Sequence, residues 1–263
     1  MSKKYRVGVV GATGVVGSEI VKILESRKFP VSQLRLFASE RSLGHSVGFN
    51  GKQVDVEVLK EDALVDLDFV LFSAGSEISK EFCPIAAKRG IVCIDNTSYF
   101  RMDDSVPLIV PEVNASDLKH HNNIIANPNC STAQLMVVLK PIMDAVGIER
   151  IVVSTYQSVS GAGSSAIKEL EHQSRANLSG HELKPTSFSH PIAFNLIPQI
   201  DDFTDNGYTK EEMKMIQETN KILESDIQIT ATAVRIPVFI SHSESVNIQT
   251  KKPLSVEKAK ELL

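Results

Sequence analysis

The sequence predicts an α/β protein that combines a doubly wound, mostly parallel sheet with a second domain of α+β type. Three observations lead to this prediction. Strand-like and helix-like patterns alternate up to about residue 125, a glycine-rich turn joins the first strand to the first helix, and longer strands with alternating polar residues come later. We expect the two domains to cover residues 1–129 and 130–263.

The first part of the chain reads as strands that alternate with helices. "YRVGVVG" is a β-branched run ending in glycine, and "VVGSEIVKILESR" after it has the apolar spacing of a helix. Further strands are expected at "QLRLFAS", "QVDVEVL", "LDFVLFSAG" and "IVCIDNTS", with a helix at "SKEFCPIAAKRG" that Gly90 closes. Such alternation is typical of a parallel sheet covered by helices on both faces.

A different pattern begins after "NIIANPN". A helix is expected from Ser131 to about Ala145, and "ERIVVSTYQSVSG" follows as a long strand with alternating polar residues. Another helix is expected near "SSAIKELEHQSRANLSG", and "DIQITATAVRIPVFISHSESVNIQT" contains strand-like runs before and after Pro237. These strands are typical of a mainly antiparallel sheet with one exposed face. Residues 178–207 are expected to form loops that pack against a partner or cover a cleft.

Composition excludes several classes of protein. The 263 residues are 42% hydrophobic and carry a formal net charge of −4, which suits a globular chain with a sizeable core. No apolar stretch reaches the roughly 18 residues that span a bilayer and no signal-peptide pattern is seen, so a cytoplasmic location is expected. The sequence has no Lys/Arg block, which argues against nucleic acid and membrane partners. Three cysteines without a CxxC pair predict neither a disulfide framework nor a metal site.

The first chemical signal is the glycine-rich turn in "VGVVGATGVVGSEI". Gly11, Gly14 and Gly17 follow a strand and lead into a helix, at GxxGxxG spacing. Glycines allow a tight turn and let the backbone approach a pyrophosphate, which the N–H groups of a helix N-terminus bind. A turn that only packs strand against helix is the alternative. The place of the motif in the first strand–turn–helix unit favours a Rossmann-like dinucleotide site.

The end of the second strand indicates which dinucleotide is bound. Sites for NAD usually carry an acidic residue there, whereas this segment reads "FASERSLG". Arg41, flanked by Ser39 and Ser42, suits the 2′-phosphate of NADP because a guanidinium binds phosphate through paired donors. NADP is therefore the predicted cofactor. In the alternative, Glu40 binds the ribose and Arg41 is solvated.

Cys130 is the candidate nucleophile. It lies between an Asn-Pro-Asn turn and an apolar helix, and a helix N-terminus favours a thiolate and stabilises an oxyanion. By contrast, Cys83 and Cys93 lie within apolar patterns and are expected to be core residues. A thiolate beside a nicotinamide predicts oxidation of an aldehyde through a thiohemiacetal to a thioester, or the reverse reduction of an activated acid.

His242 is the candidate proton-transfer group, because Arg235 lies seven residues before it in "RIPVFISHSES". An odd separation puts two side chains on opposite faces of one extended strand. A kink or bulge at Pro237 would instead bring both side chains to one cleft. The sequence leaves these two arrangements open.

Seven motifs in order resemble those of aspartate-semialdehyde dehydrogenases, over nearly the whole chain. They are "GATGVVG", "ASERSLG", "NPNCST", "YQSVSGAG", "HPIAFNLIPQID", "EEMKM..ET.KI" and "RIPVFISHSES". The resemblance implies NADPH-dependent reduction of L-4-aspartyl phosphate to L-aspartate 4-semialdehyde, with release of phosphate, through a cysteine thioester. It places the reaction on the route to diaminopimelate, lysine, methionine and threonine, and implies a homodimer.

The same resemblance implies roles for individual residues. Cys130 would form the acyl-enzyme, His242 would act as acid and base, and Gln157 would orient the substrate at the thiol. Arg235 would bind the substrate α-carboxylate through paired hydrogen bonds, and Glu211 would bind the α-ammonium.

A phosphate site is also implied. Lys214, on the same helical face as Glu211, would reach the phosphate, and Arg101 and Asn129 would complete the site. Without the resemblance, Glu211 and Lys214 would read as an ordinary surface ion pair. The residues implied to contact or lie near the cofactor, besides the glycines of the turn, are Thr13, Val15, Val16, Arg41, Ser42, Gly75, Ser160 and Gly161.

The chain departs from the family pattern at its end. Family members usually continue for several dozen residues, whereas this sequence stops at "KKPLSVEKAKELL" within an amphipathic helical pattern. A truncated chain is expected, with an incomplete cofactor pocket and weaker NADP binding.

Three other functions remain open. An acyl-phosphate reductase acting on N-acetylglutamyl phosphate or a phosphorylated sugar acid is the nearest, although the Glu211 carboxylate suits a free ammonium better than an acetylated amine. A thiol hydrolase with a Cys130–His242 pair leaves the glycine motif and "ASERS" unexplained. A truncated, non-enzymatic protein that keeps only the dimer-forming domain is the third.

Overall fold

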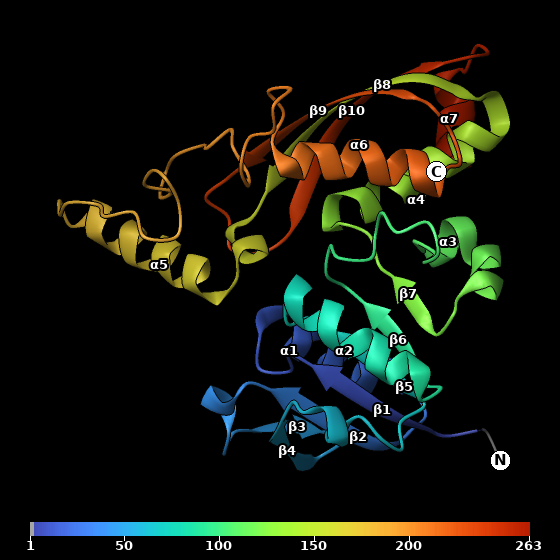
Figure 1. Ribbon diagram of the computed structural model, residues 1–263. Helices are drawn as coiled ribbons and strands as arrows, with labels where there is room; N and C mark the ends of the chain where they lie inside the picture. The colour runs from blue at the N-terminus through green and yellow to red at the C-terminus, as the bar shows by residue number, and fades with distance from the viewer. Residues whose placement is uncertain (1–2) are drawn as a thin grey trace. The chain divides into compact units, whose positions relative to one another are not determined.

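The computed structural model describes residues 3–263, and the chain divides into two compact units, Met1–Pro128 and Asn129–Leu263 (Figure 1). Within the described residues the first unit holds a seven-stranded sheet and the second a three-stranded sheet. The predicted α/β class, with a parallel sheet first and a differently built sheet after it, is confirmed.

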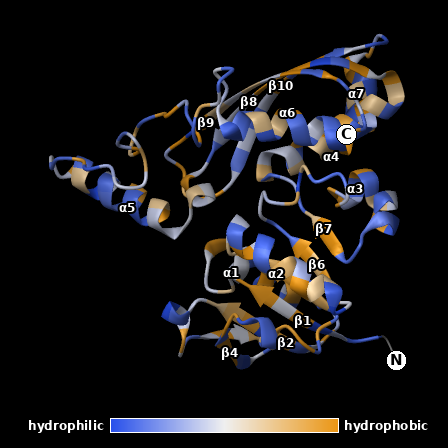
Figure 2. Cartoon of the chain, viewed as in Figure 1, coloured by the Kyte–Doolittle hydropathy of each residue, from blue (hydrophilic) through white to orange (hydrophobic). Residues whose placement is uncertain are grey.

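The first sheet has the strand order β3-β4-β2-β1-β5-β6-β7. All neighbouring strands are parallel except the β3–β4 pair. β1 is mainly hydrophobic, as Figure 2 shows, and its last four residues are buried, because helices cover both faces of such sheets. The strands are β1 (Tyr5–Val10), β2 (Val31–Ala38), β3 (Ser46–Phe49), β4 (Lys52–Val58), β5 (Phe69–Phe72), β6 (Val92–Asp95) and β7 (Ile124–Ala126).

Helices α1 (Val15–Ser26) and α2 (Ser76–Lys88) follow β1 and β5, as expected from the alternating pattern. The short helix α3 (Pro111–Asn114) and strand β3 were not expected. β3 pairs with β4 through a turn in which Asn50 and Gly51 both have positive φ, at 49° and 73°. Asn-Gly is the preferred pair for such a hairpin turn, so the sequence does contain the signal for this hairpin.

Gly17 allows α1 to pack against the turn that precedes it. A Cβ at Gly17 would lie 2.1 Å from the carbonyl oxygen of Gly11, whereas a Cβ at Gly14 would lie 3.3 Å from the same atom. We expect Gly17→Ala to lower the free energy of unfolding by about 3 kcal/mol or more, since backbone must move. Gly14→Ala should cost about 1 kcal/mol. Urea unfolding of both variants checks this, and equal losses would contradict it.

The second sheet has β8 (Ile148–Gln157) at its centre, antiparallel to β10 (His242–Thr250) and parallel to β9 (Gln228–Arg235). Helices α4 (Cys130–Val146) and α6 (Lys210–Ile222) contact each other and pack on this sheet. Residues of β8 alternate, with Ile151 and Val153 buried on one side and Tyr156 exposed on the other. One face of the sheet therefore forms the core of this unit.

Two further helices complete the second unit, α5 (Ser164–Leu178) and α7 (Val256–Leu262). The stretch between α5 and α6 is irregular, as expected, and is tied to α5 by buried side chains. Glu169 accepts hydrogen bonds from the backbone of Thr186 and Ser187, and Gln173 accepts from the N–H groups of Ile192 and Ala193. No helix among residues 3–263 is both long and apolar enough to cross a bilayer.

Candidate functional site

The first unit contains a cavity of about 540 Å³ at the carboxyl ends of its central strands. Ligands of parallel α/β sheets bind at this edge. Gly11 has a φ of 83°, and a Cβ there would lie 2.9 Å from the backbone of Ser73. Only glycine lets the turn after β1 come so close to the end of β5. The cavity is lined by Val10, Gly11, Thr13, Gly14, Ala38, Ser39, Arg41, Leu59, Ser73, Ala74, Ile78 and Phe82.

Five of the residues expected at the cofactor line this cavity, and five more lie within three residues of a lining residue in the chain. Gly11, Thr13, Gly14, Ser39 and Arg41 belong to the lining. The Ser42 hydroxyl lies 3.1 Å from the Thr13 hydroxyl, and Gly75, with a φ of 102°, precedes the first residue of α2. The others in the same turn or helix are Val15, Val16 and Gly17.

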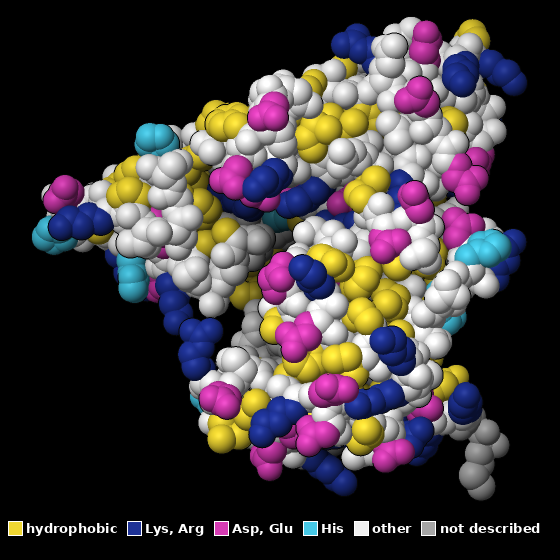
Figure 3. All heavy atoms as spheres, viewed as in Figure 1, with side chains coloured by type: hydrophobic (Ala, Val, Ile, Leu, Met, Phe, Trp, Pro, Cys, Tyr) yellow, Lys and Arg dark blue, Asp and Glu magenta, His cyan; other side chains and the backbone are white. Residues whose placement is uncertain are grey.

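Arg41 and Glu40, on which the two cofactor alternatives depend, differ in whether they line the cavity. Both side chains are exposed in a short 3-10 helix after β2, but only Arg41 is among the cavity-lining residues. A guanidinium at this position presents paired donors to an anionic ligand. On the face shown in Figure 3, acidic and basic side chains are otherwise interspersed.

Arg101, expected at the phosphate, is buried in the first unit and bonded to main-chain oxygens. Its Nε donates to the carbonyl of Asn127 at 2.9 Å, and Nη2 donates to that of Asn96 at 3.0 Å. The Asn127 amide in turn donates to the Asn96 side-chain oxygen at 2.7 Å. The guanidinium therefore helps to fix the segment that leads to the thiol.

Cys130 is the first residue of α4, and its side chain is exposed. The helix begins one residue earlier than expected, because Asn129 is the N-cap. Its side-chain oxygen accepts from the N–H groups of Ser131 at 2.9 Å and Thr132 at 3.4 Å. A thiol in the first turn of a helix faces the positive end of the helix dipole.

Three predicted site residues lie side by side across the second sheet. Gln157 of β8 is in register with Arg235 of β9 on one side and with His242 of β10 on the other. Residues directly opposite each other in a sheet point to the same face. The chain reaches this arrangement by passing from β9 to β10 across β8, so neither one extended strand nor a kinked strand describes it.

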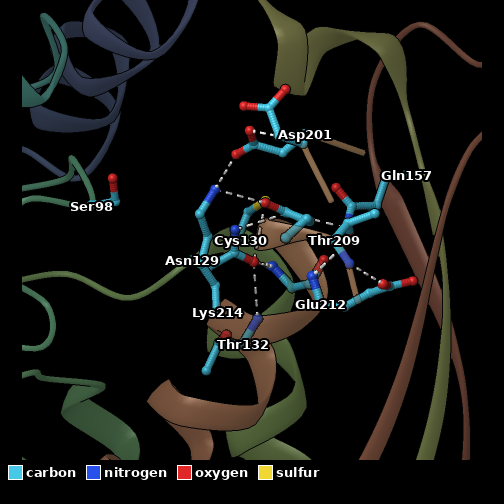
Figure 4. Close-up of polar contacts among 12 residues, drawn as sticks. Ser98, Asn129, Cys130, Thr132, Gln157, Asp201, Thr209, Glu212 and Lys214 are labelled. Carbon is cyan, nitrogen blue, oxygen red and sulfur yellow. Dashed lines mark hydrogen bonds and ion pairs between the residues drawn. The ribbon is translucent and has the colours of Figure 1, made fainter. Parts of the chain in front are cut away.

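Glu211 is the polar centre of the second-unit site. The Asn129 amide donates to Glu211 Oε1 at 2.9 Å, and the Gln157 amide donates to the same oxygen at 3.3 Å. Lys214 Nζ lies 3.2 Å from Glu211 Oε2 and 3.1 Å from Asp201 Oδ2 (Figure 4). Glu211 and Lys214 therefore form an ion pair, as in the alternative without the family resemblance, but the carboxylate is buried, the ammonium is half-buried, and Glu211 also contacts the residue before Cys130.

Burial and charge shift the pKa values of the basic groups here. Burial lowers the pKa of Arg235, against the attraction of Glu211 and Cys130. His242 also has a lowered pKa, through burial and then the nearby Arg235, opposed by the Ser241 backbone and Glu211. Burial alone would lower the pKa of Lys214, but Glu211 and Asp201 raise it overall. Burial therefore favours the neutral imidazole of His242, whereas Glu211 and Asp201 favour the charged ammonium of Lys214.

Main-chain contacts hold the imidazole and the guanidinium in place. The N–H of Ser158 donates to His242 Nδ1 at 3.0 Å, and Arg235 Nη1 donates to the Ser158 carbonyl at 2.7 Å. A Cβ at Gly161 would lie 3.0 Å from Arg235 Nη1 and 3.6 Å from His242 Nε2. Gly161 therefore leaves these two groups uncovered, and Ser160 precedes it in the same 3-10 helix.

Sequence reasoning did not single out Gln134 and Glu244. These two residues join helix α4 to strand β10 through a hydrogen bond. Gln134 lies one helical turn after Cys130 and donates to Glu244, two residues after His242, at 2.7 Å. Burial raises the pKa of Glu244 to about 7, against the lowering effect of the Gln134 hydrogen bond. Helical periodicity puts Gln134 on the same face as Cys130, and strand periodicity puts Glu244 on the same face as His242. Neither period indicates that Gln134 and Glu244 contact each other.

Glu244 makes stability depend on pH. A carboxyl group with a raised pKa in the folded state disfavours folding as it ionises, so stability falls from about pH 4.5 to about pH 7. Glu244→Gln keeps an acceptor for Gln134 and removes the charge. We expect the variant to raise the unfolding temperature by roughly 2–4 °C at about pH 8 and to leave it unchanged near pH 4.5. Calorimetry at the two pH values measures this, and an equal shift at both would contradict it.

Comparison with known proteins reveals the family. Residues 6–121 match the NAD binding domain of semialdehyde dehydrogenases, and residues 139–263 match their dimerisation domain. A curated aspartate-semialdehyde dehydrogenase of Aquifex aeolicus is 54% identical over 98% of this chain and 78% of its own length. The chain belongs to the aspartate-semialdehyde dehydrogenase family. As a member of that family it is an oxidoreductase with a nicotinamide dinucleotide-binding domain.

Solved structures of aspartate-semialdehyde dehydrogenases have the same fold. The Vibrio cholerae enzyme II, complexed with ASA, superimposes with a TM-score of 0.98 at 51% identity, covering 100% of this chain and 79% of that one. An enzyme from Candida albicans with NADP has a TM-score of 0.77 at 24% identity, over 98% of this chain and 75% of that one. The second resemblance concerns the fold alone.

Proposed function

We propose that the chain catalyses NADPH-dependent reductive dephosphorylation of L-4-aspartyl phosphate to L-aspartate 4-semialdehyde. The observation that carries the proposal is the row of Arg235, Gln157 and His242, joined through Glu211 to the residue before Cys130. This row supplies a cation, an amide and an imidazole on one face of a sheet, next to a thiol at a helix N-terminus. Family membership supports the same reaction.

The chemistry follows a covalent route. The Cys130 thiolate attacks the acyl carbon, and the carbon–oxygen bond to phosphate breaks to leave a thioester. NADPH, when bound, supplies the hydride that reduces the thioester carbon. His242, which has taken the proton released as the Cys130 thiol ionised, then protonates the oxygen that becomes negative and takes the proton back as the tetrahedral species expels the thiolate. The N–H groups at the start of α4 stabilise the same oxygen.

The substrate's charged groups have partners of opposite sign. Arg235 is proposed to bind the α-carboxylate and Glu211 the α-ammonium, while Gln157 orients the acyl group. The half-buried Lys214 is the proposed phosphate contact, with Arg101. Asn129 also stays in the proposed phosphate site, although its side chain caps α4 and binds Glu211.

NADP is the proposed form of the cofactor, bound by residues 1–129, with Ser160 and Gly161 beside the nicotinamide. The cavity fits a dinucleotide because the glycine turn opens it and Arg41 lines it. We expect Arg41→Ala to weaken NADP binding about 10- to 100-fold, the value of a charge-assisted contact, and NAD binding less than about threefold. Fluorescence titration with both reduced cofactors measures this, with Arg27→Ala as an exposed control. Equal losses for both cofactors would favour the Glu40 alternative.

Residues 130–263 are proposed as the catalytic and dimer-forming domain. The match to a dimerisation domain supports a homodimer, and no nucleic acid or membrane partner is proposed. The proposed pathways are lysine and diaminopimelate, threonine and methionine biosynthesis, in the cytoplasm.

The decisive test mixes the protein with aspartate semialdehyde, phosphate and NADP, and follows the absorbance of NADPH. Reduction that depends on all three components is the expected result, and its absence would remove the proposed activity. N-acetylglutamate semialdehyde serves as the competing substrate. Faster turnover of the acetylated aldehyde would overturn the role of Glu211 as an ammonium partner and favour the related acyl-phosphate reductase.

A further inference from the structure

Glu218 is a buried carboxylate on α6 to which the chemistry above gives no role. Glu218 is 1% exposed, and its Oε2 accepts a hydrogen bond from the backbone N–H of Asn129 at 2.6 Å. A buried carboxylate loses its hydration, so it persists only where strong hydrogen bonds offset that cost. At 2.6 Å, the bond from the Asn129 N–H to the Glu218 carboxyl oxygen is a short one.

The bond reaches the residue that immediately precedes the thiol. Glu211 and Glu218 are seven residues apart, on one face of α6, and both contact Asn129. Glu211 binds the side-chain amide at 2.9 Å, and Glu218 binds the main chain. The side-chain oxygen of Asn129 caps α4 at the same time. With the two cap bonds, four hydrogen bonds of Asn129 therefore fix the peptide from which Cys130 projects.

The two glutamates differ in what happens when substrate arrives. Glu211 also contacts Gln157 and Lys214, and in the proposed reaction it binds the α-ammonium, so its bond to Asn129 is in competition. The bond from Glu218 goes to a main-chain N–H that no substrate group replaces. It therefore holds the start of α4 throughout the reaction.

We propose that Glu218 is a positioning residue that holds Cys130 at the start of α4 in the geometry for attack. This inference rests on the proposed function of Cys130 as nucleophile. It predicts that loss of the Glu218 bond slows the thiol's reactions while substrate binding through Arg235 and Glu211 is kept.

The chain offers a matched control on the same helix. Glu212 is also buried, and it accepts from the backbone N–H groups of Thr209 at 2.7 Å and Ala233 at 2.9 Å. Its bonds hold the start of α6 and strand β9, and none of them reaches Asn129. Glu212→Gln therefore perturbs a buried carboxylate of α6 without touching the thiol's peptide.

The experiment compares Glu218→Ala, Glu218→Asp and Glu218→Gln with Glu212→Gln in the full chain. The rate of alkylation by iodoacetamide is measured as a function of pH, beside kcat, KM and the unfolding temperature. Cys83 and Cys93 are buried, and Cys130→Ala gives the background rate. Aspartate shortens the side chain by one methylene and glutamine keeps an acceptor of full length, so the series remains readable if the alanine variant does not fold.

We expect Glu218→Ala and Glu218→Asp to lower kcat and the alkylation rate about 10- to 100-fold, with KM for aspartate semialdehyde changed less than about threefold. Glu218→Gln should recover most of both rates. Wild-type alkylation in Glu218→Asp, or an equal loss in Glu212→Gln, would overturn the proposal. If the wild type lacks phosphate-dependent activity, the proposed function fails, whereas the alkylation series still decides whether Glu218 positions the thiol.

Discussion

Replacing Cys130 by alanine is expected to lower kcat for phosphate-dependent reduction of NADP by at least about 1,000-fold. Without the thiolate no thiohemiacetal forms, and the aldehyde would have to lose hydride and bind phosphate without a covalent intermediate. The remaining groups proposed to bind the substrate, the helix N-terminus and the row of Arg235, Gln157 and His242, are unchanged in this variant. We therefore expect KM for the aldehyde to change little, which steady-state kinetics with both variants can show.

Cys93→Ala is the matched control for this loss. Cys93 is fully buried in β6, and its thiol donates to the carbonyl of Cys83 at 3.4 Å. Its removal leaves a small cavity in the core of the first unit, which lowers the unfolding temperature but not kcat. A Cys130→Ala enzyme that turned over at the wild-type rate, or a Cys93→Ala enzyme that lost activity while folded, would contradict the thioester route.

The fold of the first unit was predictable because its signals are local. A parallel strand covered on both faces reads as a continuous apolar run, and a helix reads as a 3.6-residue period. The hairpin formed by β3 was overlooked although Asn50-Gly51 marks its turn, because the flanking strand of four residues is short and half polar. Strands of this length carry too few residues for an alternating pattern to stand out.

The residues of the candidate site could be named one by one from the sequence, but their arrangement could not be predicted. Cys130 could be singled out because helix caps and thiol chemistry are both visible over six consecutive residues. The row that contains Arg235 and His242 could not, because it depends on which strands flank β8 and in which register. Spacing along the chain says nothing about pairing between distant segments, and a one-residue slip would turn every side chain to the other face.

The same limit applies to buried partners. Glu218 and Glu244 read in the sequence as ordinary charged residues of a helix and a strand. Their roles follow from one contact each, with Asn129 and with Gln134, across 89 and 110 residues of chain. Only the packing of α6 on α4, and of α4 on β10, brings those pairs together.

Arg235→Ala is expected to lower kcat/KM for aspartate semialdehyde about 100- to 1,000-fold, because a paired, charge-assisted bond to the α-carboxylate is lost in a buried site. Arg235→Lys keeps the charge without the paired geometry, and its kcat/KM for aspartate semialdehyde should fall about 10- to 100-fold. Arg150→Ala, an exposed arginine of β8, is the control and should stay within about twofold.

A substrate without the carboxylate separates binding from a general loss of structure. For 3-aminopropanal, which lacks only that group, wild type and Arg235→Ala should have nearly equal kcat/KM. The loss caused by removing the guanidinium and the loss caused by removing the carboxylate should therefore not add. The pKa of His242 should also rise, since burial remains but the repulsion from Arg235 is gone. In a plot of kcat against pH, the limb that requires a neutral imidazole then moves to higher pH. If instead Arg235→Ala lost as much activity with 3-aminopropanal as with aspartate semialdehyde, the guanidinium would stabilise the sheet rather than bind the substrate carboxylate.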